Sequence, residues 1–524
     1  MTDACLGLEA GIDTLRTYVQ TSSVPLISRG LEKEGLRTLA NSDISQSDHP
    51  KALGHPLTHS SITTDYSEAL LELITGVESN ADNLLSQLEM THRFVLNNIG
   101  DELLWAGSMP CHLDGDKSIR IAEYGDSNIG RLKHIYRKGL DVRYGRIMQS
   151  IAGLHFNFSL SDEFWMQLKD ADNSQTDLQT YKSEKYFALT RNFRRYSWLL
   201  MYLFGASPAL DASFLNGKSS DLEVFDEKGT YYKPYATSLR MSDLGYTNNA
   251  QSSLNICFNT LDNFTKTLGD AIHTSYPSYE KIGLKDDHDY TQLNTNILQI
   301  ENEYYSSIRP KRTTFSGEKP TAALIERGVE YVEVRCLDLN PYLPLGIDKQ
   351  QVTFMDGFLL FCLLQDSPFL SAEACEELER NFTLVTNEGR KPNLSLNQND
   401  QARDLKEWAT SLLANIEQVS SALNKQDAAA LKSAIKAQQA KVNDSALCPS
   451  ARVLADMQSK SASWLELCTA LSSEHKSQLL ASSINEQKLS ELESTAKQSH
   501  QDAQNIKQAD NVPFDAFLDA YVSP

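Results

Sequence analysis

The chain has 524 residues, of which 41% are hydrophobic and 23% charged, a composition typical of globular proteins with a buried core. Its formal net charge of −20 repels phosphate backbones and anionic lipid surfaces, so nucleic acids and membranes are poor candidates as partners. The longest apolar stretches are too short to span a bilayer, no export signal is visible, and the eight cysteines show no C-x-x-C pair or zinc spacing. We therefore predict a cytoplasmic protein with reduced thiols.

Near the N-terminus, residues 1–25 carry apolar side chains at near-helical spacing and predict an amphipathic helix. The next segment, 29–37, has the pattern of a strand and places Glu32 and Glu34 on one face, because side chains alternate along an extended chain. Two neighbouring carboxylates repel each other unless solvent or a cation compensates them, and such oxygen-rich clusters suit Mg²⁺ or Mn²⁺. By itself the pattern is more typical of an exposed, solvated acid pair.

A second pair of acids, Asp65 and Glu72, is separated by seven positions. On a continuous helix the two side chains would share a face, and on a continuous strand they would not, so the sequence leaves their relation open. The simpler interpretation makes Asp65 a helix N-cap and Glu72 a surface acid.

Two later segments alternate with the period of a strand. In 151–160, His155 belongs to the polar face opposite a row of Leu and Phe, although a single histidine is more often structural than a ligand. In 328–341, Glu333 and Arg335 share a face, and such a pair is more often a salt bridge than a functional site.

Two segments are locally basic in this acidic chain. One is 127–146, which is equally consistent with a solvated helix face. The other, 300–312, carries Arg309, Lys311 and Arg312 and is a plausible anion-binding segment or an ordinary surface. The sequence has no P-loop or Rossmann glycine fingerprint and no nucleophile elbow. A nucleotide, if bound, would have to be held by metal and by local cations.

Beyond residue 370 the composition changes, because Ala, Ser, Gln, Lys and Glu dominate there with helical periodicity. We predict a main domain over residues 1–370 and a mainly helical accessory region over 371–524. The accessory region carries no recognisable chemistry.

Several motifs between about residues 26 and 392 closely resemble, in order and at near-constant spacing, the proteobacterial type of glutamate–cysteine ligase, also called γ-glutamylcysteine synthetase. They are RGLEKE from Arg29, LTHSSITTDYSEALLE from Leu57, SMPC from Ser108, YRKGL from Tyr136, LFGASPA from Leu203, PYATSLRMSDLGYTN from Pro234, IRPKR from Ile308 and EYVEVRCLDLNP from Glu330. The resemblance is highly specific over this range and weak over the helical tail.

The resemblance implies an α+β fold like glutamine synthetase, with a curved antiparallel sheet that forms a funnel, flanked by helices, and a helical C-terminal region. It implies that L-glutamate, L-cysteine and ATP are converted to γ-glutamylcysteine, ADP and phosphate, the first step of glutathione synthesis. By analogy with the family we also expect Mg²⁺ (or Mn²⁺) as cofactor, a monomer, and feedback inhibition by glutathione.

The resemblance also implies roles for particular residues. The metal ligands would be Glu32, Glu34, Asp65, Glu72, His155 and Glu333. Arg240 would hold the glutamate carboxylate, and Arg335 would steady the transferred phosphoryl group, with Glu333 beside it in the catalytic centre. The acceptor cysteine would lie among Tyr66, Tyr136, Leu140, Gln149, Tyr246 and Tyr305. Lys311 and Arg312 are candidates for binding the nucleotide phosphates.

The chemistry of the implied reaction accounts for these residue types. A carboxylate is a poor electrophile, so the γ-carboxylate first attacks the terminal phosphate of ATP to form an acyl phosphate, which the cysteine amine then displaces. Both steps gather negative charge, which metal ions and an arginine stabilise, and water must be excluded from the acyl phosphate.

Two positions depart from the family pattern: Tyr66 stands where the motif carries Phe, and Asp126 replaces a more usual Thr. Neither is a metal ligand in the implied set, so they concern substrate preference rather than reaction class. Two alternatives stay open: a related carboxylate–amine ligase with another amine acceptor, and a non-catalytic ligand-binding member of the fold. The second predicts a lost metal ligand or phosphate arginine, and none is missing.

Overall fold

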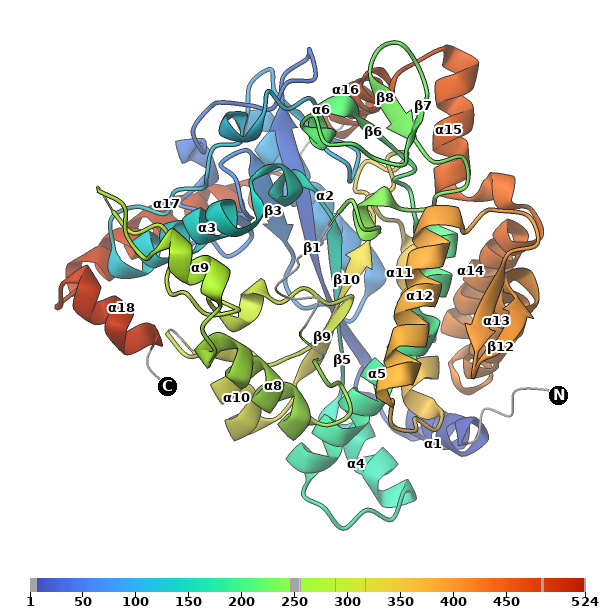
Figure 1. The fold of residues 1–524 in the computed structure, drawn as a ribbon. Coiled ribbons are helices and arrows are strands. Elements are labelled where there is room, and N and C mark those ends of the chain that lie inside the picture. The colour runs from blue at the N-terminus through green and yellow to red at the C-terminus, as the bar shows by residue number, and fades with distance from the viewer. Residues whose placement is uncertain are drawn as a thin grey trace.

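A seven-stranded sheet forms the centre of the protein (Figure 1). The computed structural model describes residues 7–245, 254, 256–287, 289–315, 317–481 and 485–522. The strand order is β2-β3-β1-β5-β10-β9, with β4 also pairing with β1, and every pair is antiparallel. The strands are β1 (Ile27–Thr38), β2 (Ile62–Thr64), β3 (Leu70–Ile74), β4 (Leu103–Leu104), β5 (Leu154–Leu160), β9 (Ile308–Lys311) and β10 (Tyr331–Leu337).

The three strands predicted from alternation are confirmed. In β5, Phe156 and Phe158 are fully buried, and in β10, Val332 and Val334 are fully buried, as expected for residues on the core face of a pleated strand. The strand β1 is buried over most of its length on both faces, because β3 and β5 pair with its two edges and helices cover the sheet.

Helices flank the sheet and complete the predicted α+β class (Figure 1). The helices before residue 370 are α1 (Leu8–Thr21), α2 (Ala81–Asn98), α3 (Asn128–Tyr144), α4 (Asp162–Ala171), α5 (Leu178–Phe204), α6 (Ala212–Leu215), α8 (Leu261–His273), α9 (Pro277–Ile282), α10 (Pro320–Arg327) and α11 (Lys349–Leu364). The helices predicted at 1–25 and from the basic segment 127–146 correspond to α1 and α3.

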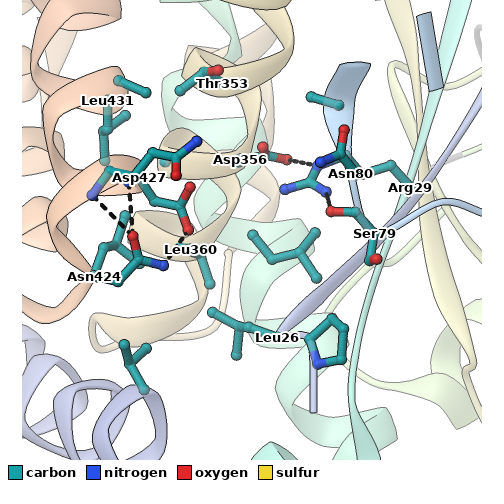
Figure 2. A pocket seen from close by; sticks show the side chains of 18 of the residues that line it. Leu26, Arg29, Ser79, Asn80, Thr353, Asp356, Leu360, Asn424, Asp427 and Leu431 are labelled. Atoms are coloured by element: carbon teal, nitrogen blue, oxygen red, sulfur yellow. Dashed lines mark hydrogen bonds and ion pairs between the residues drawn. The ribbon is translucent and has the colours of Figure 1, made fainter. Parts of the chain in front are cut away.

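Helix α11 is almost entirely apolar and buried, and it packs against α5. One polar contact ties it to the sheet: Arg29 Nε of β1 lies 2.7 Å from Asp356 Oδ1 of α11 (Figure 2). A small sheet of β6 (Ala209–Asp211), β8 (Thr230–Tyr232) and β7 (Glu223–Val224) lies apart from the central sheet.

The segment after residue 370 is mainly helical, as predicted. Its helices are α12 (Ala372–Glu388), α13 (Leu405–Val419), α14 (Lys425–Asn443), α15 (Pro449–Lys460), α16 (Trp464–Ala481), α17 (Glu486–Ala509) and α18 (Phe514–Val522). A hairpin of β11 (Ser395–Gln398) and β12 (Gln401–Asp404) interrupts them, which the helical periodicity did not indicate. The division into two domains at residue 370 stays a prediction.

The interpretation of Asp65 as a helix N-cap is wrong. Asp65 directly follows β2, its backbone N–H donates to Leu70 O, and Glu72 lies on the next strand, β3. The two acids therefore belong to a hairpin, which neither the continuous helix nor the continuous strand describes.

Among the described helices, none combines the length and the apolar character needed to cross a bilayer.

Candidate active site

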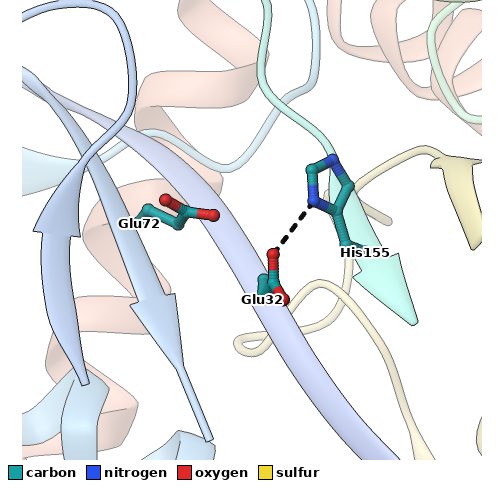
Figure 3. Close-up of side chains that lie close together, drawn as sticks. All are labelled: Glu32, Glu72 and His155. Atoms are coloured by element: carbon teal, nitrogen blue, oxygen red, sulfur yellow. Dashed lines mark hydrogen bonds and ion pairs between the residues drawn. The ribbon is translucent and has the colours of Figure 1, made fainter. Parts of the chain in front are cut away.

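Acidic side chains of β1 and β3 and the imidazole of His155 on β5 converge on one face of the sheet. In the strand registers, Glu32 lies opposite His155 of β5, and Glu34 lies opposite Glu72 of β3. Opposed residues in antiparallel strands have their side chains on the same face, about 5 Å apart at Cβ. One ligand atom each of Glu32, Glu72 and His155 accordingly lie within 4.8 Å of one another (Figure 3).

His155 lies at the centre of this cluster. Its Nδ1 is 3.2 Å from Glu32 Oε2 and 4.0 Å from Glu333 Oε1, and its Nε2 is 3.6 Å from Glu34 Oε1. The Glu34 and Glu333 side chains are only 6% and 4% exposed. The Glu32 side chain is 19% exposed, so the interpretation of Glu32 and Glu34 as an exposed, solvated pair is wrong.

The electrostatics of the cluster show an excess of negative charge. Burial, and then the charges of Glu32, Asp65 and other acids, raise the pKa of Glu72 well above its usual value. Burial also raises the pKa of Glu34, although His155 opposes the rise. Crowded carboxylates that repel one another beside an imidazole nitrogen suit a divalent cation, so these residues fit the metal site that the resemblance implies.

Glu333 differs from the other acids because cations surround it. Its Oε1 is 3.4 Å from Lys311 Nζ, and its Oε2 is 3.5 Å from Arg335 Nε. Burial alone would raise the pKa of Glu333, but Lys311, Arg335 and His155 hold it below its usual range. Glu333 thus links the acid cluster to a group of basic side chains.

A cavity of about 120 Å³ opens beside the cluster, and we name it the first cavity. Its lining combines predicted ligands and predicted substrate-binding residues that come from six separate segments of the chain. From the predicted set it contains Glu34, Asp65, Tyr66, Tyr136, Leu140, Gln149, His155, Arg240, Tyr305 and Arg335. Tyr246, also predicted, lies outside the described residues.

Arg240 is held rigidly at this cavity. It belongs to a short 3-10 helix, is 1% exposed, and donates from Nη2 to Arg335 O and from Nη1 to Leu337 O at 3.1 and 3.2 Å. A Cβ atom at position 153 would lie 1.9 Å from Arg240 Nη2, so only Gly153 allows the guanidinium to approach the backbone this closely.

A second cavity of about 280 Å³ lies along β9, next to the first. Lys311 and Arg312 line it, together with Arg309, and Asn302 lines both cavities. Lys311 faces the acid cluster through Glu333, whereas Arg312 Nη1 donates to Arg327 O at 2.9 Å. The two predicted cations therefore share a cavity but contact different neighbours.

Residues 12–385 of this chain match the model of the glutamate–cysteine ligase family. The chain belongs to the glutamate–cysteine ligase family. The predicted family and the predicted ligase class are thereby confirmed.

Known members of the glutamate–cysteine ligase family agree over nearly the whole chain. The glutamate–cysteine ligase of Hahella chejuensis is 53% identical over 505 residues, which cover 95% of each chain. That of Pseudomonas putida is 50% identical over 504 residues, covering 95% of this chain and 96% of its own.

Solved structures agree as well. The crystal structure of glutamate–cysteine ligase from Francisella tularensis in complex with AMP superposes with a TM-score of 0.89 at 36% identity, covering 95% of this chain and 98% of that one. A bifunctional glutathione synthetase from Pasteurella multocida, at 23% identity and a TM-score of 0.71, shares the fold; the match covers 90% of this chain and 55% of that one.

The structure adds residues to the candidate active site beyond those predicted as site residues from the sequence. Arg137 of α3 lines the first cavity, and the local excess of cations in the basic segment 127–146 was the available signal. The buried Arg309, one of the three cations of the plausible anion-binding segment, lines the second cavity. Asn302 and Glu303, which also line the first cavity, carry no such signal.

Proposed function

We propose that this chain joins the γ-carboxylate of L-glutamate to the amine of L-cysteine. ATP gives its terminal phosphoryl group to the carboxylate to form γ-glutamyl phosphate and ADP, and the amine then displaces phosphate, as the first step of glutathione synthesis. The observation that carries this proposal is the convergence of Glu32, Glu72 and His155 with the basic residues around Glu333 at a small cavity. Membership of the glutamate–cysteine ligase family supports the same reaction.

We assign the metal site to the acid cluster. Glu32, Glu34, Asp65, Glu72, His155 and Glu333 would hold Mg²⁺, and their oxygen-rich set would also accept Mn²⁺. Bound there, the ion would supply the positive charge that compensates both the crowded carboxylates and the phosphates of ATP. The raised pKa values of Glu34 and Glu72 support this assignment, because their burial and mutual repulsion outweigh the favourable contacts that the chain provides.

The nucleotide would occupy the second cavity. Lys311 and Arg309 lie between this cavity and Glu333, so they would meet the phosphates, and Arg312 lies further along the same wall. Their fixed positive charges require no reorganisation when phosphate charge develops. The AMP in the Francisella tularensis relative supports a nucleotide site in this fold.

The amino acids would occupy the first cavity. Arg240, held against Gly153, would bind a carboxylate of glutamate, and Arg335, 3.5 Å from Glu333, would steady the phosphoryl group as it moves to the γ-carboxylate. The cysteine would lie among Tyr66, Tyr136, Leu140, Gln149 and Tyr305, where its amine displaces phosphate from the acyl carbon. These side chains leave little room for water, which would hydrolyse the acyl phosphate.

The test of this assignment is ADP release with glutamate and one of three acceptors: cysteine, 2-aminobutyrate or alanine. We expect the highest kcat/KM with cysteine. Equal values for cysteine and alanine would favour a ligase with another acceptor, and no ADP release with any acceptor would favour a non-catalytic protein.

The metal assignment has its own test. Glu34→Gln should sharply lower the Mg²⁺-dependent rate, because it removes one ligand and one negative charge from the cluster. Glu227→Gln, an equivalent change at an exposed site outside both cavities, serves as the control. A wild-type rate in Glu34→Gln would remove this residue from the metal site.

We also propose that residues 1–370 form the catalytic domain, and that the enzyme acts as a cytoplasmic monomer inhibited by glutathione. The resemblance to the family supports these properties, and the seven described cysteines, all free thiols, are consistent with a reducing compartment.

A further inference from the structure

A cavity of about 320 Å³ lies away from the proposed active site, and we name it the distal cavity. It is enclosed by α1, the start of β1, the N-terminal turn of α2, α11 and α14 (Figure 2). Among the described residues, none lines both this cavity and either of the two cavities at the acid cluster. Its volume falls in the range of pockets that bind small molecules.

One wall of the distal cavity carries a buried arginine with a donor to spare. The side chains of Arg29 and Asp356 are 10% and 12% exposed and are joined at 2.7 Å through Arg29 Nε, while Nη1 donates to Ser79 O. Within the described ranges, no hydrogen bond engages Nη2 of Arg29. A guanidinium has five N–H donors, so a nine-tenths buried arginine in this position can still bind an anionic group.

The opposite wall carries a carboxylate. Asp427 of α14 accepts one hydrogen bond, from Asn424 Nδ2 at 2.7 Å, and faces Asp356 across the cavity (Figure 2). Burial raises the pKa of Asp356, Arg29 opposes the rise, and the negative charge of Asp427 adds to it. Asp427 is therefore within electrostatic reach of the buried pair, and its carboxylate can accept further hydrogen bonds from a cation.

The surface between these two walls is apolar. Leu360 and Leu431 are 1% exposed, and Leu26 lies beside them. At the mouth, Lys349 Nζ and Asp82 Oδ2 satisfy each other at 2.6 Å. What the cavity offers a ligand is thus one donor for an anion, one acceptor for a cation, and an apolar wall.

We propose that the distal cavity binds a small zwitterion with an apolar side chain, an α-amino acid, whose carboxylate meets Arg29 Nη2 and whose ammonium group meets Asp427. Arg29 precedes Glu32 by three positions on β1. A ligand held there would contact the same strand that carries two of the proposed metal ligands, from the other face of the sheet.

L-Leucine is the probe, and isothermal titration of the full-length protein is the measurement. We expect millimolar or tighter binding that saturating L-glutamate leaves unchanged, because glutamate would fill the first cavity. Isopentylamine lacks the carboxylate, and 4-methylpentanoate lacks the ammonium group; both should bind about tenfold or more weakly than leucine. No heat of binding up to about 10 mM leucine, or binding abolished by glutamate, would overturn the proposal.

The variant that tests the ammonium contact is Asp427→Asn, which keeps an oxygen for Asn424 and lies at an exposed position where the fold tolerates the change. We expect leucine affinity to fall about tenfold. The control is Glu417→Gln on the neighbouring α13, an exposed acid outside the cavity, which should leave affinity unchanged. Equal affinities in the two variants, or equal binding of leucine and isopentylamine, would show that the cavity does not select a zwitterion. ADP release with glutamate and cysteine, measured in parallel, tests the proposed function separately.

Discussion

Tyr66 and Tyr124 are two tyrosines of equal burial and different hydrogen bonding, and replacing each with Phe should change stability in opposite directions. Both side chains are 1% exposed. The Tyr124 hydroxyl donates to Thr64 O at 2.7 Å and accepts from Thr64 Oγ1 at 2.9 Å. The Tyr66 hydroxyl has no hydrogen-bond partner in the described part of the chain.

A buried polar group without a partner costs about 1–3 kcal/mol, whereas a satisfied hydrogen bond contributes about 0.5–1.5 kcal/mol. Tyr66→Phe should therefore raise the free energy of unfolding of the substrate-free enzyme by about 1–3 kcal/mol, and Tyr124→Phe should lower it by about 1 kcal/mol. Denaturant titration of both variants beside the wild type measures the two values. Destabilisation of similar size in both variants would refute the reasoning.

The same substitution should change acceptor selectivity, because Tyr66 lines the first cavity and a bound acceptor thiol would give its hydroxyl a partner. Loss of one such hydrogen bond lowers kcat/KM for cysteine by about two- to tenfold. The value for 2-aminobutyrate, whose methyl group replaces the thiol, should stay unchanged. An equal fall for both acceptors would mean that the hydroxyl does not recognise the thiol.

Three further predictions concern charge and packing around the sheet. Glu72→Gln should stabilise the metal-free protein, because it relieves repulsion by Glu32 and Asp65. The same change should lower the thermal stabilisation that Mg²⁺ produces. Equal stabilisation by Mg²⁺ in the variant and the wild type would contradict the prediction. Burial lowers the pKa of Lys33 from 10.5 to about 7, so between these two pH values the native state binds fewer protons than the unfolded chain. The free energy of unfolding should therefore rise with pH across that window. Lys33→Met should flatten this rise, measured by denaturant titrations at pH 7 and 9. The ring of Phe514 on α18 packs 4.3 Å from the Arg131 guanidinium of α3. Phe514→Ala should therefore loosen α18 from α3 and raise KM for cysteine more than KM for glutamate. Equal changes in the two KM values, measured by steady-state kinetics, would exclude an effect through α3.

Local patterns predicted which side chains share a face. The alternation around Glu32, His155 and Glu333 correctly described β1, β5 and β10, because the period of two belongs to the extended backbone and is independent of the partner strands. The motif resemblance added the family and, with it, an expected ligand set whose members the fold brings together. These parts of the site are accessible from residues close together in the sequence.

The hairpin at Asp65 shows where local patterns fail. Spacing alone offered a helix or a strand, but the chain reverses direction between the two acids, and only the pairing of β3 with β1 places Glu72 opposite Glu34. Register depends on long-range hydrogen bonding between strands, which a local pattern does not contain.

The primary structure alone thus determined the family, the antiparallel α+β class, and the residue types that gather in the acid cluster. Tertiary structure decided that Glu34 is buried and Glu32 half-buried rather than solvated, and that Arg137 and Arg309 line the cavities. It also decided that the Tyr66 hydroxyl lacks a partner among the described residues, and that a separate cavity forms around Arg29. Burial and unsatisfied polar groups result from the packing of segments distant along the chain, so no single segment encodes them.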